Sequence, residues 1–209
     1  MAGKTEILFH YFAKQITRVV LGFFFRVRAY GQERLPVEGG ALLLSNHQSY
    51  LDPPLIGIAA RRPLVYMARD TLFSNPLFAA VLSLVGVFPV KRGKSDKDAI
   101  RLAIEHLKAG EILVMFPEGR RTSDGRLQPI KGGFRLLVRR ARVPVIPVAV
   151  DGTYGAWPRS RLLPRPRQVR INYGVPVPPE EFENLSDDEA GQRLTREISF
   201  LFEKLRNLP

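Results

Sequence analysis

The chain has 209 residues, which by length is one domain and is enough for a substantial core. It contains no cysteine, which excludes disulfide bonds, thiolate nucleophiles and cysteine metal ligands. Its 32 Lys and Arg against 20 Asp and Glu give a net charge of +12. This balance favours anionic partners: phosphorylated substrates, anionic lipid head groups or nucleic acid.

The first thirty residues predict an amphipathic helical segment. Its apolar residues recur at three- and four-residue steps: Leu8, Phe12, Ile16, Val19, Val20, Phe23 and Val27. The uncharged runs at 7–13 and 19–25 are far shorter than the ~20 residues of a spanning helix, and no signal-peptide cleavage pattern follows them. We expect a helix lying in a membrane interface, with Phe12, Arg18, Phe23 and Phe24 as its contacts. Packing of the stripe on the domain core is the alternative.

A histidine and an aspartate at short spacing form the strongest chemical signal. The apolar run 41–44 predicts a buried strand, and 52–54 predict the start of a helix, so His47 falls on the turn between them. Open α/β sheets place their chemistry at such carboxyl ends of strands. A carboxylate such as Asp52 can hold the tautomer of His47 and stabilise the imidazolium that forms when it takes a proton. The pair therefore predicts a general base.

The uncharged stretch 71–90 is long enough to span a bilayer, but its helix-capping and helix-ending residues favour a different structure. Asn75 can cap a helix and Pro76 can occupy its first position, which predicts a short helix over 78–84. Gly86 then ends that helix, and 87–90 read as a strand.

Two further strand ends carry cations. Lys91 and Arg92 follow the predicted strand 87–90, and the segment 116–122 follows another at 111–115 with Glu118, Arg120 and Arg121. The guanidinium group of arginine can donate two parallel hydrogen bonds to a pair of phosphate oxygens, and lysine adds a localised positive charge. A base beside such an anion site suits proton abstraction from a hydroxyl of a phosphorylated substrate.

The remaining elements alternate between strand and helix. Strands are predicted at 64–67, 145–150 and 169–173, and helices at 96–109, at 134–142 and after a capping box that begins at Ser186. This alternation favours an α/β domain over 31–209, with a mixed, mostly parallel sheet flanked by helices, preceded by the segment 1–30. The proline-broken basic stretch 158–167 is an ordinary solvated loop or a small lipid-contacting tip.

Four ordered blocks resemble those of the glycerolipid acyltransferase family, whose best-known members are the 1-acyl-glycerol-3-phosphate acyltransferases. They are Asn46-His47-x4-Asp52, the segments 86–92 and 116–122, and the strand around 143–148. The third block usually reads Glu-Gly-Thr-Arg-Ser. Here Arg120 takes the threonine position and Thr122 the serine position, while Arg121 keeps its own.

The resemblance implies transfer of an acyl group from acyl-CoA or acyl carrier protein to the sn-2 hydroxyl of lysophosphatidate. His47 and Asp52 would be catalytic, and the substrate phosphate and glycerol would contact Lys91, Arg92, Glu118, Gly119, Arg120, Arg121 and Thr122. It implies no cofactor and no metal, and a monotopic enzyme on the cytoplasmic face of an anionic membrane.

Other interpretations stay open from sequence. The extra cation Arg120 is compatible with another lysophospholipid or a lyso-aminolipid as acceptor. A non-catalytic membrane-binding protein would not need His47, Asp52 and Glu118 together. Nucleic-acid binding is suggested by charge alone, without a recognisable motif.

Overall fold

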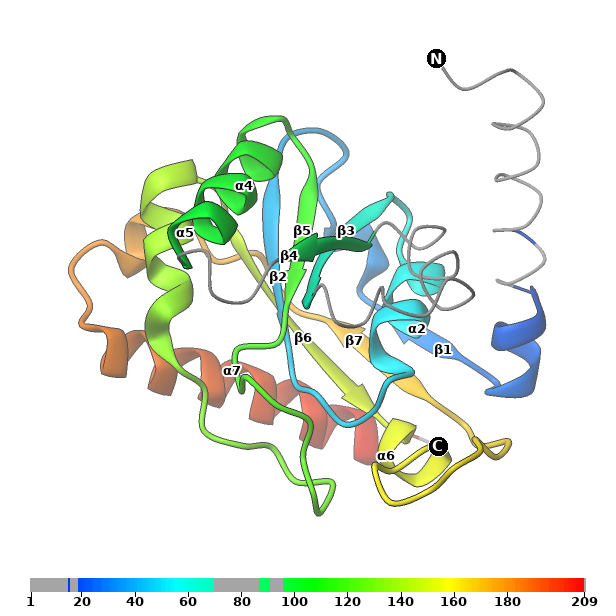
Figure 1. Cartoon of the computed structure of the whole chain (residues 1–209). Helices are drawn as coiled ribbons and strands as arrows, with labels where there is room; N and C mark the ends of the chain where they lie inside the picture. The colour runs from blue at the N-terminus through cyan, green and yellow to red at the C-terminus, as the bar shows by residue number, and fades with distance from the viewer. Residues whose placement is uncertain (1–14, 16–18, 70–86, 91–95, 209) are drawn as a thin grey trace, which may run out of the picture.

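The computed structural model describes residue 15 and residues 19–69, 87–90 and 96–208, and its centre is one seven-stranded sheet (Figure 1). The strand order is β1-β7-β6-β2-β5-β3-β4. Every neighbouring pair is parallel except the antiparallel pair β6–β7. The mixed, mostly parallel sheet predicted from the sequence is confirmed. Its strands are β1 (Arg28–Tyr30), β2 (Ala41–Ser45), β3 (Leu64–Arg69), β4 (Val87–Val90), β5 (Ile112–Met115), β6 (Val145–Asp151) and β7 (Arg170–Tyr173).

Helices cover both faces of the sheet (Figure 1). One face packs on α2 (Asp52–Ala59), and the other packs on α4 (Asp96–Lys108), α5 (Arg135–Ala141) and α7 (Asp187–Arg206). Short helical turns complete the described chain: η1 (Gln32–Arg34), η3 (Gly132–Phe134), α6 (Thr153–Ala156) and η4 (Pro179–Phe182).

The central strand β2 shows why its sequence is a continuous apolar run. Leu43 packs in the cluster under α2, whereas Leu42 and Leu44 pack in the cluster with α4 and α7. A parallel strand covered by helices on both faces buries both sets of alternating side chains, so every residue of β2 is buried.

Strand β1 extends the sheet into the segment that the sequence assigned to the N-terminal helix. Arg28–Tyr30 pair in parallel with β7 at the edge of the sheet, and Phe25 just before them is buried in the core. These residues therefore belong to the folded α/β unit. Residues 19–24 before them are helical, and Phe23 is exposed.

The predicted helix at 78–84 lies outside the described residues. Within the part of the chain that the structure describes, no helix is both long enough and apolar enough to cross a bilayer.

The topology brings three loops to one edge. Strands β5 and β6 flank β2 and run parallel to it, so the segments that follow these three strands meet at their carboxyl ends. His47, Glu118 and α6 lie on those segments.

Candidate active site

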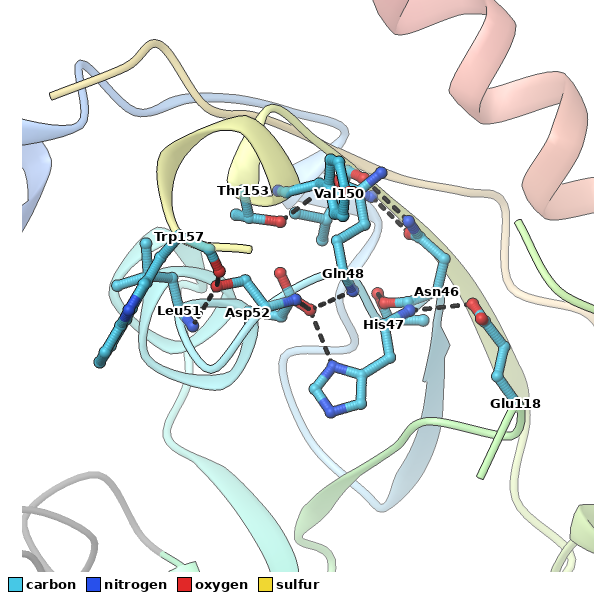
Figure 2. A network of polar contacts seen from close by, with 12 residues as sticks. Asn46, His47, Gln48, Leu51, Asp52, Glu118, Val150, Thr153 and Trp157 are labelled. Atoms are coloured by element: carbon cyan, nitrogen blue, oxygen red, sulfur yellow. Dashed lines mark hydrogen bonds and ion pairs between the residues drawn. The ribbon is translucent and has the colours of Figure 1, made fainter. Parts of the chain in front are cut away.

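His47 and Asp52 form the hydrogen-bonded pair that their spacing predicts. Nδ1 of His47 lies 2.8 Å from Oδ2 of Asp52, and the other ring nitrogen points away from the carboxylate (Figure 2). The histidine side chain is 18% exposed, while Asp52 is completely buried. The pair therefore keeps one nitrogen accessible and holds the other inside the protein.

Several hydrogen-bond donors contact the Oδ2 atom of Asp52. Besides His47, it accepts the backbone N–H of Gln48 at 2.6 Å and that of Ser49 at 2.7 Å. An oxygen that accepts two N–H groups acts as an acceptor toward the ring as well, so Nδ1 carries the proton of the neutral imidazole. In that tautomer Nε2 is the nitrogen without a proton. Asp52 is also the first residue of α2, where the helix dipole favours a negative charge.

Three polar side chains fix the turn that carries His47 (Figure 2). Asn46 exchanges two hydrogen bonds with the backbone of Val150, donating at 2.9 Å and accepting at 2.7 Å. The Gln48 side chain accepts from the hydroxyl of Thr153 at 3.1 Å. Ser49 donates to the carbonyl of Trp157 at 2.8 Å. These bonds tie the turn to β6 and to the residues that follow it, which limits the freedom of the histidine backbone.

Glu118 contacts this turn from the neighbouring strand end. Its Oε1 accepts the backbone N–H of His47 at 2.9 Å, and the residue is only 6% exposed. Burial, with a smaller contribution from the charge of Asp52, raises the pKa of Glu118 to about 7, although the backbone N–H groups of His47 and Gln128 oppose the rise. The carboxyl is thus held beside the base by its contact with the main chain.

Phe116 orients the histidine ring by stacking. The centroids of the two rings are 4.1 Å apart, and their planes differ by 23°. The ring of His47 is thus fixed by Asp52 at one edge and by Phe116 on one face.

The predicted cations divide into two groups. Arg121 lies with its guanidinium carbon 3.5 Å from the centroid of the Tyr50 ring, beside the turn of His47, while Arg120 is exposed. Lys91 and Arg92 lie outside the described residues, as do Phe12 and Arg18 of the predicted membrane contacts.

Thr122 and Gly119 shape the loop after β5. The buried Thr122 hydroxyl donates to Asp124 at 2.7 Å and accepts the N–H of Gly125 at 3.1 Å, and the Thr122 N–H donates to the His47 carbonyl at 2.8 Å. Gly119 has a φ of +74°, which suits glycine. Both residues stabilise the loop that supports His47, and their contact with a substrate stays a prediction.

Sequence reasoning missed several members of the site. The side-chain bonds of Asn46, Gln48 and Ser49, the stacking of Phe116 and the pairing of Tyr50 with Arg121 were not predicted. The one available signal was their position, since each lies within or beside the two blocks that carry His47 and Glu118. Among the described residues, no three His, Cys, Asp or Glu side chains gather as a metal site requires.

A histidine paired with a buried carboxylate at the carboxyl end of a mostly parallel sheet, with Arg121 over the neighbouring Tyr50, is the arrangement expected of a catalytic site. A family model described as Acyltransferase matches residues 26–151, which include His47, Asp52 and Glu118. The chain therefore belongs to the acyltransferase family and is an acyltransferase.

Individual proteins extend the comparison. The 1-acyl-sn-glycerol-3-phosphate acyltransferase of Bacillus subtilis is 26% identical over 94% of this chain and 96% of its own length. That of Streptococcus pneumoniae is 30% identical over 78% of this chain and 60% of its own length. The crystal structure of the 1-acyl-sn-glycerophosphate (LPA) acyltransferase PlsC from Thermotoga maritima covers all of this chain (100%) and 85% of its own, with a TM-score of 0.79 and 25% identity.

Proposed function

We propose that the protein transfers a fatty acyl group from a thioester to the sn-2 hydroxyl of 1-acylglycerol-3-phosphate, giving phosphatidic acid. The observation that carries this proposal is the 2.8 Å contact between His47 Nδ1 and Asp52 Oδ2, which leaves Nε2 as a base. The names of the relatives from Bacillus subtilis and Streptococcus pneumoniae and of the Thermotoga maritima structure support the choice of acceptor.

The reaction needs one base and no enzyme nucleophile. His47 Nε2 takes the proton of the acceptor hydroxyl as the oxygen attacks the thioester carbonyl. Asp52 stabilises the resulting imidazolium and keeps Nε2 aimed at the substrate. When the tetrahedral intermediate collapses, the C–S bond breaks and the imidazolium returns its proton to the thiolate. The chain has no cysteine, which is consistent with direct attack rather than a thioester enzyme intermediate.

The acceptor phosphate would bind beside this base. Arg121 supplies a guanidinium at the turn of His47, and Lys91, Arg92 and Arg120 complete the predicted set of cations. Gly119 and Thr122 shape the loop that presents these arginines. Glu118 supports the base by accepting the His47 N–H through Oε1, and its second carboxyl oxygen, which is buried and has no hydrogen-bond partner among the described residues, is proposed to contact the substrate glycerol.

The acyl donor is acyl-CoA or acyl carrier protein, both of which are acidic and suit a chain with a net charge of +12. The proposed enzyme uses no cofactor. We place it as a monotopic protein on the cytoplasmic face of an anionic membrane. Its N-terminal segment, with Phe23 85% exposed and Phe24 partly so, would lie in the interface.

The first test compares purified wild type with His47→Ala, using acyl-CoA and lysophosphatidate and measuring free thiol and phosphatidate. Loss of a general base lowers turnover by roughly 10²–10⁴-fold. His106→Ala is the matched control, because His106 pairs with Glu111 outside the site and should leave turnover unchanged. Near-normal turnover of His47→Ala would contradict the mechanism.

The acceptor is tested separately with a panel of lysolipids. The departure at Arg120 keeps another lysophospholipid or a lyso-aminolipid open as the acceptor. Acyl transfer that depends on His47 but prefers one of these over lysophosphatidate would keep the mechanism and replace the substrate.

A further inference from the structure

Two adjacent leucines form the exposed tip of the loop between α6 and β7. Leu162 is 88% exposed and Leu163 is 71% exposed. We propose that residues 158–167, which we call the arginine–leucine loop, dock on an anionic lipid bilayer, with these two leucines inserted below the head groups. Four exposed arginines flank the tip and would bind the lipid phosphates: Arg159, Arg161, Arg165 and Arg167.

Hydrogen bonds close the base of the loop and direct its tip outward. The indole N–H of Trp157 donates to the carbonyl of Arg161 at 3.0 Å, and the N–H of Arg161 donates to the carbonyl of Pro158 at the same distance. Arg165 donates from its Nε to the carbonyl of Gly155 at 2.7 Å. The exposed leucines therefore stand on a bonded base, so inserting them requires little further ordering of the backbone.

The loop lies at the same end of the sheet as the candidate active site. It follows β6, which runs parallel to β2, and the Ser49 hydroxyl donates to the carbonyl of Trp157 at 2.8 Å. The Trp157 and Tyr50 rings are 6.0 Å apart, and Arg121 covers Tyr50. Docking through this loop would place His47 near the lipid surface. This position would give His47 access to a substrate in the bilayer, an advantage that rests on the proposed lysolipid substrate.

A second exposed apolar surface, on the helical residues before Phe25, lies beside this loop. Val169, just after the loop, donates its N–H to the carbonyl of Phe25 at 3.0 Å and accepts the N–H of Arg28 at 2.9 Å. The helical residues before Phe25 expose Val19, Val20 and Phe23. Figure 1 shows this helix in blue and the loop in yellow toward the same lower right part of the molecule. Two neighbouring apolar surfaces suit one extended partner, which a bilayer provides.

A bilayer also satisfies both kinds of side chain in the loop. Anionic lipids offer phosphates at the depth of the arginines and hydrocarbon just beneath, where leucine side chains leave water. An acidic protein would pair with the arginines but has no such layered arrangement. Dependence on the leucines therefore separates the two partners.

The test is flotation of the full chain with vesicles of phosphatidylcholine and phosphatidylglycerol, without substrate. Leu162→Ser with Leu163→Ser should lower the partition coefficient by about tenfold or more, because the variant loses the apolar area that the two leucines would bury in the hydrocarbon. Val37→Ser is the matched control. Val37 is 87% exposed in the turn before β2, at the opposite end of the sheet from the loop, so this variant should bind normally.

Trp157 supplies a second measurement, because it is the one tryptophan of the chain and lies at the base of the loop. Vesicles that carry brominated acyl chains should quench the fluorescence of Trp157 in the bound wild type. Arg159→Gln with Arg161→Gln should weaken binding to anionic vesicles and reduce its dependence on salt.

Three results would overturn the proposal. Unchanged flotation of the leucine variant would do so directly. Bound wild-type protein with unquenched Trp157 would assign docking to the N-terminal segment alone. If the arginine variant bound vesicles normally but lost binding to purified acyl carrier protein, the partner of the loop would be an acidic protein. Because flotation needs no turnover, a failure of the proposed reaction would be seen in the acyl-transfer assay and not here.

Discussion

Side chains at this site are held by contacts with segments that follow other strands. Glu118 shows how such a buried position changes the pKa of a carboxyl group. Its carboxyl is buried and contacts the N–H of His47. A buried carboxylate is less stable than one in water, so the protonated form is favoured and the pKa rises to about 7 from an ordinary value of 4.5. The folded protein therefore binds a proton that the unfolded chain releases at lower pH.

This pKa shift predicts a pH dependence of stability. Between pH 4.5 and about 7 the folded state holds more protons than the unfolded state, so the contribution of Glu118 is present at the acidic end and is lost as pH rises. Glu118→Gln keeps the acceptor for His47 and removes the titration. Its free energy of unfolding, measured by denaturant titration, should fall less over this range than that of wild type.

The control for Glu118→Gln is Glu189→Gln. The hydrogen bonds from Ser186 lower the pKa of Glu189 below its ordinary value of 4.5, so this residue affects the pH dependence only in more acidic solution. The slope of stability against pH between 5 and 7.5 should match wild type in this variant. An unchanged slope in Glu118→Gln would show that the carboxyl ionises normally.

The two arginines of the loop after β5 should differ in function. Arg121 is positioned over Tyr50 beside His47, whereas Arg120 is exposed. We expect Arg121→Ala to raise KM for lysophosphatidate by roughly 10-fold or more, as a charge-assisted hydrogen bond of about 1.5–3 kcal/mol would give. Arg120→Ala should have a smaller effect. Steady-state kinetics with each substrate varied separately would distinguish acceptor from donor.

Equal effects of Arg121→Ala on the KM of the acceptor and on the KM of the donor would show that the acceptor phosphate does not bind at Arg121. A larger effect of Arg120→Ala than of Arg121→Ala would exchange their assigned roles.

At the scale of elements, α7 illustrates how a local signal fixes a helix start. The Ser186 hydroxyl accepts the N–H of Glu189, and the Glu189 carboxylate accepts the N–H of Ser186, as the sequence predicted. Ser186→Ala should lower the free energy of unfolding by about 1 kcal/mol. Ser199→Ala, in the interior of the same helix, should be neutral or slightly stabilising because alanine has the higher helix propensity. Chemical denaturation of both variants provides the comparison.

The N-terminal boundary is a second prediction at this scale. Removing residues 1–18 keeps Phe25 and β1, so the fold should survive and vesicle association should weaken. Removing residues 1–30 also removes the edge strand and a buried phenylalanine, whose loss from a core is worth about 3–5 kcal/mol. Thermal unfolding should separate the two truncations clearly. Equal stability would mean that β1 and Phe25 contribute little to the domain.

Elements set by local pattern were predictable, and those set by distant partners were not. The apolar runs of β2 and β6, the capping box of α7 and the glycine after α4 all carry their own signals. Strand β1 has three residues, two of them polar or aromatic, and it exists because β7 lies beside it. No short window of sequence contains that information.

At the scale of the whole molecule, the same distinction holds for the site. The chemical pair His47 and Asp52 was predictable because its members are five residues apart. The supports of that pair were not, because Asn46 bonds to Val150 and His47 to Glu118 across the sheet. A carboxylate in sequence shows its chemistry but not its protein partner, so the bond from the His47 N–H to Glu118 was not predicted, and the contact of Glu118 with a substrate stays a prediction.

The position of β1 has a consequence for biosynthesis. Among the described strands β1 is the first in chain order, yet its neighbour in the sheet is the last, β7 (Arg170–Tyr173). Strand β1 therefore has no sheet partner until β7 has left the ribosome. During that interval the exposed apolar residues just before it can meet a lipid surface. Under the proposed membrane placement, this segment would contact lipid before the β1 edge of the sheet is complete.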